Sequence, residues 1–340
     1  MEIRAYAIRG PGEPATPFTY QRTLGPHDVL VRLTHRTMTR GDTQFIDNDW
    51  GDTRFPLVPS HEMVGTVEQA GPDVAEPRAG ERVGIGYQLG ACFACSFCRE
   101  GLEQFCPDQT VVGVNAYGGL GEHIVVDGRF AFRLPSPLDS ARATPLMSSG
   151  LTVYSAILHA RLSAGARVAV LGIGGLGRLA LRLLRAMDHQ VSAFSRSPEK
   201  RDLIGRLGAE YIDGSDPEAL AALRATFDFI LSTLNVPFDL DPYLTMLRPQ
   251  GQLCFVASPL EPLSLRAGRL YDYGRRRIYG SYVGSRSDAA GMLEFAATHD
   301  VLPEVDVMPL TQVKEAIRRI RAREASTALV LESPDASSAR

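Results

Sequence analysis

The chain has 340 residues, more than one hydrophobic core usually organises, so two domains are expected. Hydrophobic residues make up 44% of the sequence and charged residues 22%, which excludes a wholly disordered chain. The net charge of −3 and the lack of a long apolar run argue against nucleic-acid and membrane partners. The N-terminus lacks the apolar core of a signal peptide, so a cytoplasmic location is expected.

Short apolar segments separated by glycine and proline fill the first part of the chain, up to about residue 150. This pattern is typical of strands and turns. Strands are predicted at residues 28–37, 62–71, 82–90 and 122–128. The N-terminal part is therefore expected to be an all-β unit.

Four of the five cysteines interrupt this unit with the spacing C-x2-C-x2-C-x7-C, at Cys92, Cys95, Cys98 and Cys106. Cytosolic thiols stay reduced, which disfavours disulfides. Four thiolates around one tetrahedral ion leave no position for substrate, so the spacing predicts a structural zinc. The alternative is a group of unrelated exposed thiols. The fifth cysteine, Cys254, is expected to be a buried strand residue.

Beyond residue 145 strands and helices alternate. A buried strand at 167–171 is followed by a glycine turn, an amphipathic helix and a second strand that ends near Ser195. The remaining predicted elements are strands at 209–215, 227–233 and 251–258, helices at 287–300 and 310–324, and a strand at 327–333. The sequence predicts an α/β protein with a doubly wound parallel sheet.

The glycine turn has the pattern G-x-G-x-x-G directly after a strand and at the start of a helix. In a dinucleotide site the first glycine makes the turn, the second admits the pyrophosphate, and the third allows close helix–strand packing. The alternative is a glycine-rich turn without a ligand. The candidate cofactor-binding residues of the turn are Gly172, Gly174, Gly175, Leu176 and Gly177.

The end of the second strand indicates which dinucleotide binds. An NAD site usually carries an acid there for the ribose hydroxyl. Here the sequence is Ser195-Arg196-Ser197, with Lys200 close behind. Donors and cations suit a 2′-phosphate, so NADPH is predicted. Solvated Arg and Lys at a helix start are the alternative.

The chain resembles a medium-chain zinc alcohol dehydrogenase of the cinnamyl alcohol dehydrogenase type. The segments that carry this resemblance are 39–71, 92–106, 117–130, 145–157, 170–177 and 278–288. It implies a GroES-like catalytic domain at 1–149 and 287–340, with a structural-zinc lobe at about 90–107. It also implies a Rossmann NADP-binding domain at 150–286, an active-site cleft between the domains, and a homodimer that acts on a small molecule.

The resemblance does not extend to the ligands of the catalytic zinc. The family holds that metal with two cysteines and the histidine of a G-H-E motif. The cysteine positions are Thr39 and Ser148 here, whereas His61 and Glu62 remain. Hydroxyls are poor zinc ligands beside thiolate, imidazole and carboxylate, so tight zinc binding is not expected. The family's proton-relay positions have also changed, to Gly41 and Gln44.

Other functional positions of the family are present. The resemblance places Arg40, Thr152 and Ser281 beside the cofactor and Trp50 and Tyr117 beside the substrate. It also makes Asp42 the acid that orients His61, and that contact is expected to survive without a metal. The candidate catalytic residues are Thr39, Asp42, His61, Glu62 and Ser148.

Three hypotheses follow. In the first, NADPH reduces an iminium whose charge Glu62 stabilises, or a conjugated C=C whose oxygen takes a proton or hydrogen bond from Ser148, Thr39 or protonated His61. In the second, the chain is a zinc-dependent cinnamyl-type alcohol dehydrogenase with an unusual ligand set that includes Glu62 and Asp42. In the third, it binds nucleotide without catalysis.

Overall fold

The computed structural model describes residues 1–272, 274–325 and 327–334. Residue contacts divide the chain into two compact units. Unit 1 comprises Met1–Ser148 and Ser285–Arg340, and unit 2 is the continuous stretch Ser149–Gly284. Whether each unit folds as an independent domain, with the boundaries expected from the sequence, stays a prediction. No helix among the described residues is long and apolar enough to cross a membrane.

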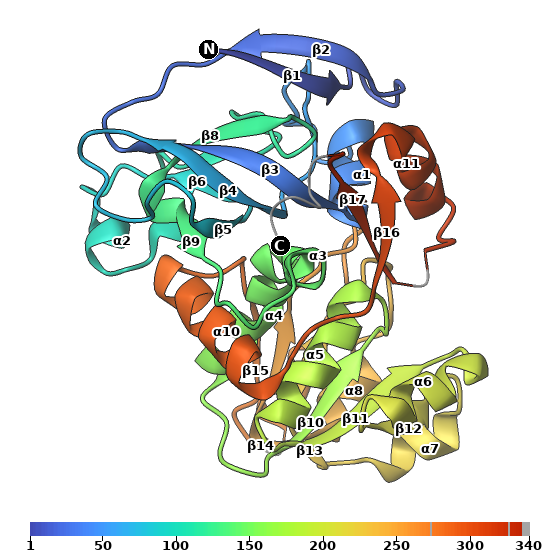
Figure 1. Ribbon diagram of the computed structural model, residues 1–340. Helices are drawn as coiled ribbons and strands as arrows, with labels where there is room; N and C mark the ends of the chain where they lie inside the picture. The colour runs from blue at the N-terminus through green and yellow to red at the C-terminus, as the bar shows by residue number, and fades with distance from the viewer. Residues whose placement is uncertain (273, 326, 335–340) are drawn as a thin grey trace. The chain divides into compact units, whose positions relative to one another are not determined.

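A mixed sheet with the strand order β16-β17-β3-β4-β5-β9 organises unit 1, and β8 pairs with β3 (Figure 1). Strands β16 and β17 are parallel, and the other neighbours are antiparallel. The bounds are β3 Asp28–Met38, β4 Met63–Ala70, β5 Arg82–Ile85, β8 His123–Asp127, β9 Ala131–Arg133, β16 Val305–Pro309 and β17 Ala328–Glu332. Two small sheets add β1 Glu2–Ala7 with β2 Thr16–Gln21, and β6 Gln88–Gly90 with β7 Thr110–Val111.

Strand β3 lies in the core of unit 1 because both of its faces are buried. Val29, Val31 and Leu33 belong to one hydrophobic cluster, whereas Leu30 and Met38 belong to the other. This alternation follows from the two-residue period of a strand. The two clusters therefore sandwich the sheet, and residues at the end of β3 enter the region where α1 begins.

The helices of unit 1 lie around this sheet. Their bounds are α1 Arg40–Asp47, α2 Ser96–Arg99, α3 Ser140–Ala143, α10 Arg286–His299 and α11 Val313–Arg321, with the short 3-10 turns η1 Glu103–Phe105, η2 Gly128–Phe130, η3 Thr144–Met147 and η5 Leu310–Gln312. Helix α1 was not expected, since the N-terminal part was predicted to be all β. The predicted strand at 82–90 is also divided into β5 and β6.

A parallel sheet with the order β12-β11-β10-β13-β14-β15 forms the centre of unit 2, and helices of the unit pack around it (Figure 1). Counted along the chain, this is the 3-2-1-4-5-6 order of a Rossmann fold, so the predicted doubly wound sheet is confirmed. The strands are β10 Arg167–Leu171, β11 Gln190–Ser195, β12 Glu210–Asp213, β13 Phe227–Ser232, β14 Leu247–Phe255 and β15 Arg277–Gly280. The helices are α4 Ser149–Ala160, α5 Gly175–Ala186, η4 Pro198–Lys200, α6 Arg201–Arg206, α7 Pro217–Ala222, α8 Asp241–Met246 and α9 Gly268–Tyr271.

Candidate functional site

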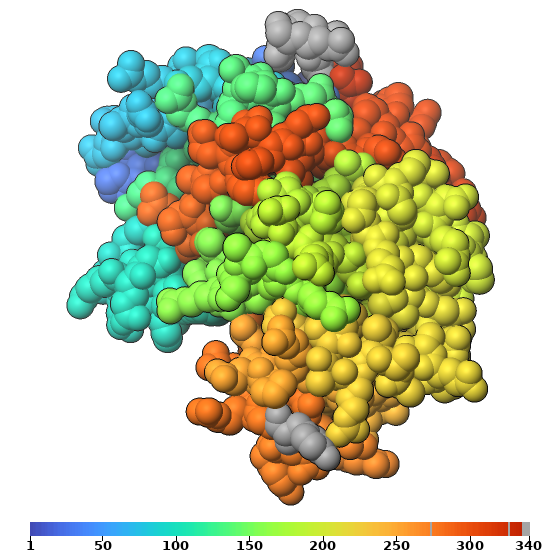
Figure 2. Space-filling model, turned by 90° about the horizontal axis from the view of Figure 1, so that it is seen from below, coloured from blue at the N-terminus to red at the C-terminus, as the bar shows by residue number. Residues whose placement is uncertain are grey.

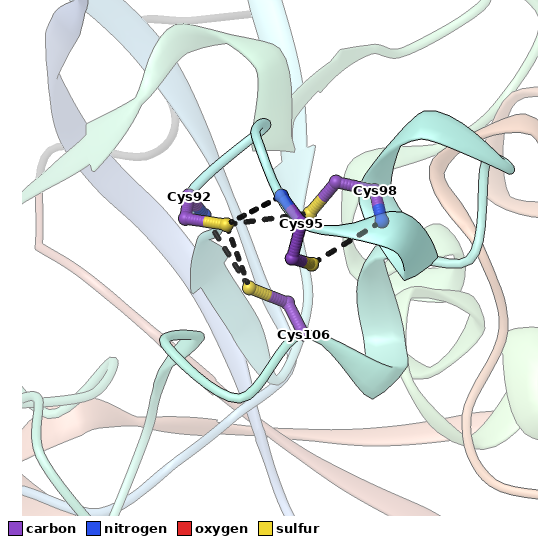
Figure 3. A group of neighbouring side chains, drawn as sticks. All are labelled: Cys92, Cys95, Cys98 and Cys106. Atoms are coloured by element: carbon purple, nitrogen blue, oxygen red, sulfur yellow. Dashed lines mark hydrogen bonds between the residues drawn. The ribbon is translucent and has the colours of Figure 1, made fainter.

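The four clustered cysteines converge on one point (Figure 3). Cys92 lies in the loop before α2, Cys95 caps the N-terminus of α2, Cys98 lies within it, and Cys106 follows η1. All four Sγ atoms lie within 4.8 Å of one another. In the space-filling view the turquoise lobe that carries them projects at the edge of the face shown (Figure 2).

This arrangement fits a zinc ion. A tetrahedral ion with Zn–S bonds of 2.3 Å requires Sγ atoms about 3.8 Å apart. The Cys92 Sγ lies 3.5 Å from that of Cys106 and 4.0 Å from that of Cys98. Backbone N–H groups of Ala94 and Cys95 donate to the Cys92 sulfur at 3.4 and 3.3 Å, as a thiolate would favour. The cluster therefore matches a closed, structural zinc site.

The glycine turn of unit 2 also has the expected local geometry. A Cβ placed on Gly177 would lie 1.9 Å from the carbonyl oxygen of Gly172, so the helix can approach the turn only with glycine there. A Cβ on Gly174 or Gly175 would meet nothing within 4 Å. This open side of the turn is where a pyrophosphate would approach the backbone, and Leu176 follows it in the first turn of α5.

Thr233, which the sequence reasoning missed, joins the ends of two strands at this turn. Its hydroxyl donates to the carbonyl oxygens of Leu171 at 3.0 Å and Gly172 at 2.7 Å. Thr233 directly follows β13, the neighbour of β10 across the point where the strand order reverses. Ligands of doubly wound sheets bind at this point, so its place after the fourth strand could have identified it.

The predicted 2′-phosphate residues surround the end of β11. The Ser195 hydroxyl accepts a hydrogen bond from the Ser197 backbone N–H at 3.1 Å, which closes a tight turn. The Lys200 ammonium donates to the Ile173 carbonyl at 3.3 Å and so supports the glycine turn. Arg196 has no ion pair within the described part of the chain. The predicted contact of Arg196 with the 2′-phosphate stays a prediction.

In unit 1, the start of helix α1 gathers three of the candidate residues. Thr39 is the N-cap, and its hydroxyl accepts from the Asp42 backbone N–H at 3.2 Å. The Thr39 backbone N–H and hydroxyl both donate to Asp42 Oδ2 at 2.8 Å. This capping box explains why the segment is helical. In this arrangement the Thr39 hydroxyl donates its proton to Asp42, and its predicted role as a donor to substrate stays a prediction.

Asp42 in turn holds His61. Its Oδ1 accepts from the Ser60 backbone N–H at 2.8 Å and lies 2.9 Å from His61 Nδ1. Burial alone would lower the pKa of His61, but the charge and hydrogen bond of Asp42, and the charge of Glu62, raise it to about 9. Burial alone would raise the pKa of Asp42, yet His61 and Thr39 hold it below its usual range. Both shifts favour the form in which His61 is an imidazolium and Asp42 a carboxylate.

Three of the candidate catalytic residues differ in exposure. Glu62, the next residue, is fully buried, and Ser148 is also buried, after η3. The His61 side chain keeps 12% of its surface exposed. The imidazole ring is therefore more accessible than the carboxylate of Glu62.

Aromatic rings stand next to His61. Phe45 and Tyr87 meet the imidazole edge-on, with ring centres 6.4 and 6.1 Å away. Trp50 packs edge-on against Phe45 at 4.7 Å and is 46% exposed. Tyr117 instead packs on Tyr20 at 4.5 Å. Trp50 is thus connected to the histidine through Phe45, whereas Tyr117 contacts the N-terminal hairpin.

The remaining predicted cofactor residues lie at element ends in both units. Arg40 is the exposed first residue of α1 in unit 1. In unit 2, Thr152 lies in the first turn of α4, and the Ser281 backbone N–H follows β15 and donates to the Phe255 carbonyl at 2.9 Å. Ser281 is thereby fixed at the carboxyl end of the sheet. The roles of these three residues beside the cofactor stay predictions.

Comparisons with known proteins match one family model mainly to unit 1 and another mainly to unit 2. The family model of the alcohol dehydrogenase GroES-like domain matches residues 25–136, and that of zinc-binding dehydrogenases matches residues 175–298. The chain is 38% identical to the aldehyde reductase AdhA of Synechocystis sp., over 97% of this chain and 98% of the relative. It is 35% identical to the NADP-dependent alcohol dehydrogenase C 1 of Mycolicibacterium smegmatis, over 97% and 98% of the two chains.

A solved structure is similar in fold over the same length. The cinnamyl alcohol dehydrogenase SbCAD4 from Sorghum bicolor superposes with a TM-score of 0.92 and 33% identity, covering 98% of each chain. The identity to these relatives extends through both units, and the four-cysteine cluster and glycine turn have the geometry described above. The chain therefore belongs to the medium-chain alcohol dehydrogenases of the cinnamyl type, a family of oxidoreductases with a GroES-like domain and a Rossmann domain.

Proposed function

We propose that this oxidoreductase is an NADPH-dependent reductase that delivers hydride to a small substrate without a catalytic zinc. The observation that carries the proposal is the hydrogen bonding at the start of α1. The Thr39 hydroxyl, at a metal-ligand position of the family, donates to Asp42 instead of facing an ion.

The distribution of metal ligands supports this reading. Among the described residues, the four cysteines are the one group of three or more His, Cys, Asp or Glu side chains close enough to hold an ion. His61, Glu62 and Asp42 do not form such a group. A zinc that activates substrate needs three protein ligands and an open position. One structural zinc per chain is therefore proposed, bound by the cysteines.

The cofactor assignment rests on the end of β11 and on the relatives. Arg196 offers a guanidinium at the place where an NAD site carries an acid, and such an acid would repel a 2′-phosphate. In addition, a relative of similar length is named as NADP-dependent. When bound, NADPH supplies the hydride. Since no metal polarises the acceptor, the acceptor must already be electron-poor, as an iminium ion or a conjugated C=C is.

Metal and cofactor measurements test the proposal together. Elemental analysis of the protein purified without added metal should give close to one zinc per chain. Arg196→Ala should weaken NADPH binding by about 1.5–3 kcal/mol and leave NADH binding nearly unchanged. Equal affinities of the parent protein for the two cofactors would remove the NADPH assignment.

A zinc-dependent aldehyde reductase is the second candidate, because one relative is named as an aldehyde reductase. Two zinc ions per chain, with activity lost when the second is removed, would establish it. The hypothesis of a nucleotide-binding protein without catalysis finds no support in these relatives. Homodimerisation and a cytoplasmic location complete the proposal. They rest on the family resemblance and on the four reduced cysteines.

A further inference from the structure

The hydrogen bonds at the end of β11 already use some of the donors predicted for a 2′-phosphate. The Ser195 hydroxyl donates to the Ser197 carbonyl oxygen at 3.4 Å, and the Lys200 ammonium donates to the Ile173 carbonyl at 3.3 Å. A phosphate group has three strong acceptor oxygens and up to two negative charges. A further donor beside Arg196 would therefore strengthen its binding.

Arg196 extends from β11 on the side of the sheet that α8 covers. A Cβ on Gly214, directly after β12, would lie 3.7 Å from Arg196 Cγ and 4.0 Å from Phe194 Cβ. The side chains of Arg196 and Phe194 thus start on the same side of Gly214. Phe194 belongs to the hydrophobic cluster that contains Leu244 and Met246 of α8. Residues of α8 are therefore the neighbours to search for a further donor.

Tyr243 of α8 is the polar residue that packs directly against Phe194. The two rings meet edge-on with centres 5.5 Å apart, and Phe238 meets Tyr243 edge-on at 5.6 Å. Contacts of this kind fix the orientation of the half-buried Tyr243 ring. Its hydroxyl forms no hydrogen bond with any other residue in the described part of unit 2. The hydroxyl is thus a positioned donor whose proton is available to a ligand.

The charges around Tyr243 place this hydroxyl near Arg196. Burial raises the pKa of Tyr243, the positive charge of Arg196 opposes that shift, and the negative charge of Asp239 adds to it. The Asp239 carboxylate accepts a hydrogen bond from the Asp241 backbone N–H at 3.0 Å. The phenol therefore keeps its proton at neutral pH. A neutral donor and a guanidinium that lie near each other suit an anion with several oxygens.

We infer that the Tyr243 hydroxyl donates a hydrogen bond to the 2′-phosphate of NADPH, next to the guanidinium of Arg196. The inference rests on the cofactor assignment of the proposed function. It makes Tyr243 a further residue that selects NADPH over NADH, because NADH has no phosphate at this place. Both residues belong to unit 2, so the contact requires only one of the two units.

Tyr243→Phe tests the contact, since it removes the hydroxyl and keeps the ring. Calorimetric titrations of the full chain would use adenosine 2′,5′-bisphosphate and 5′-AMP, which differ only in the 2′-phosphate and contain no nicotinamide. The affinity for the bisphosphate should be about 10-fold lower in the variant, and that for 5′-AMP unchanged. Equal losses for both ligands would mean that the hydroxyl binds the adenosine itself. That result, or unchanged affinities, would overturn the inference.

Tyr279→Phe is the matched control, because it makes the same change on β15, and three strands separate β15 from β11. This variant should bind both ligands as the parent protein does. Thermal melts would show that both variants are folded. Tyr243→Phe should keep the parent melting temperature, since its hydroxyl forms no hydrogen bond within the described residues.

A second background separates a direct contact from an effect on Arg196. If the hydroxyl binds the phosphate itself, Tyr243→Phe should still weaken bisphosphate binding when Arg196 is already replaced by alanine. Disappearance of the effect in Arg196→Ala would mean that Tyr243 only positions the guanidinium, and would overturn the direct contact. A parent protein that binds the bisphosphate and 5′-AMP equally would instead remove the NADPH assignment of the proposed function.

Discussion

Asp42 carries more of the site's hydrogen bonding than any other residue described here. One oxygen accepts from the backbone and hydroxyl of Thr39, and the other accepts from Ser60 and His61. The carboxylate thus joins the N-terminus of α1 to the loop before β4. Since only a carboxylate can accept at every one of these positions, its charge and its acceptor capacity are both required.

Asp42→Asn should therefore destabilise unit 1. The amide NH₂ of asparagine would face donors at one of the two oxygen positions and leave them unpaired. The expected loss is about 2–3 kcal/mol of unfolding free energy, measured by urea denaturation followed by circular dichroism. Asp73→Asn, whose side chain is 56% exposed beside His27, is the control and should cost little. A loss no greater than that of the control would contradict the role assigned to Asp42.

At the scale of secondary-structure elements, the turn between β10 and α5 contains glycines that are needed for two different reasons, close packing and ligand access. Gly177 allows the helix to approach the strand, since its Cβ would overlap a backbone oxygen. Gly174 faces open space and has an extended backbone conformation that other residues adopt. Gly177 serves packing within the protein, and Gly174 is predicted to serve the ligand.

Alanine at these two positions should give different results. Gly174→Ala should change stability by less than about 0.5 kcal/mol yet weaken NADPH binding about tenfold or more, because the methyl group occupies the ligand's space. Gly177→Ala should lose about 1–3 kcal/mol of stability as well as the cofactor. Calorimetric titration with NADPH and thermal melts distinguish the two. Equal NADPH affinity in Gly174→Ala and the parent protein would place the pyrophosphate elsewhere.

The junction of β3 and β17 should make stability depend on pH. His35 is buried there, near Thr34 and Glu332, with Arg36 and Asp139 as further charged neighbours. Burial lowers the pKa of His35, although Glu332 and Asp139 oppose the shift. Below the usual value of 6.5 the unfolded chain therefore binds a proton that the folded chain does not. Stability should fall as the pH drops through this range.

His35→Gln removes this proton uptake from the unfolded chain. Denaturation midpoints measured between pH 7.5 and 5 should fall less steeply for the variant than for the parent protein. Parallel curves would mean that His35 titrates alike in the folded and unfolded chains.

The sequence predicted β3, β4, β10, β11 and the nucleotide turn because their patterns are local. Alternating apolar residues give β3, and glycines between a strand and a helix give the turn before α5. Helix α1 was missed although Thr39 and Asp42 form the T-x-x-D start of a capping box, because the polar segment lacks a clear apolar stripe. The contact of Lys200 with Ile173 could not be predicted, since it depends on how two loops meet in space.

At the scale of the whole molecule, the zinc lobe and the nucleotide turn belong to different units. The lobe is fastened to the rest of unit 1 by Phe93, whose ring lies 3.5 Å from the Arg129 guanidinium and 5.3 Å from that of Arg286. Arg286 also pairs with Glu103 of the lobe at 3.3 Å. These contacts connect the metal site to η2 and to α10, near the start of the C-terminal segment.

Cys95→Ala should consequently release the zinc and lower the melting temperature, because a closed four-thiolate site stabilises the fold. NADPH affinity should persist at temperatures where the protein is folded, since the nucleotide turn lies in unit 2. Zinc content, thermal melts and NADPH titration measure the three effects. Cys254→Ala, at a buried position of β14, should keep its zinc. Retention of a full zinc equivalent by Cys95→Ala would remove this cysteine from the site.

The sheet of unit 1 also imposes an order on folding during synthesis. One edge of β3 is shared, because β8 pairs with residues 28–32 and β17 pairs with residues 35–38. The partner of Met38 in this pairing is Leu329, which is synthesised only after the whole of unit 2. Unit 2 is continuous in the chain, so it can complete its sheet while residues 35–38 of β3 still lack their partner strand. Part of this strand edge consequently stays unpaired while the whole Rossmann unit is synthesised. An unpaired edge can pair with another chain, so a chaperone would be of most use at this stage.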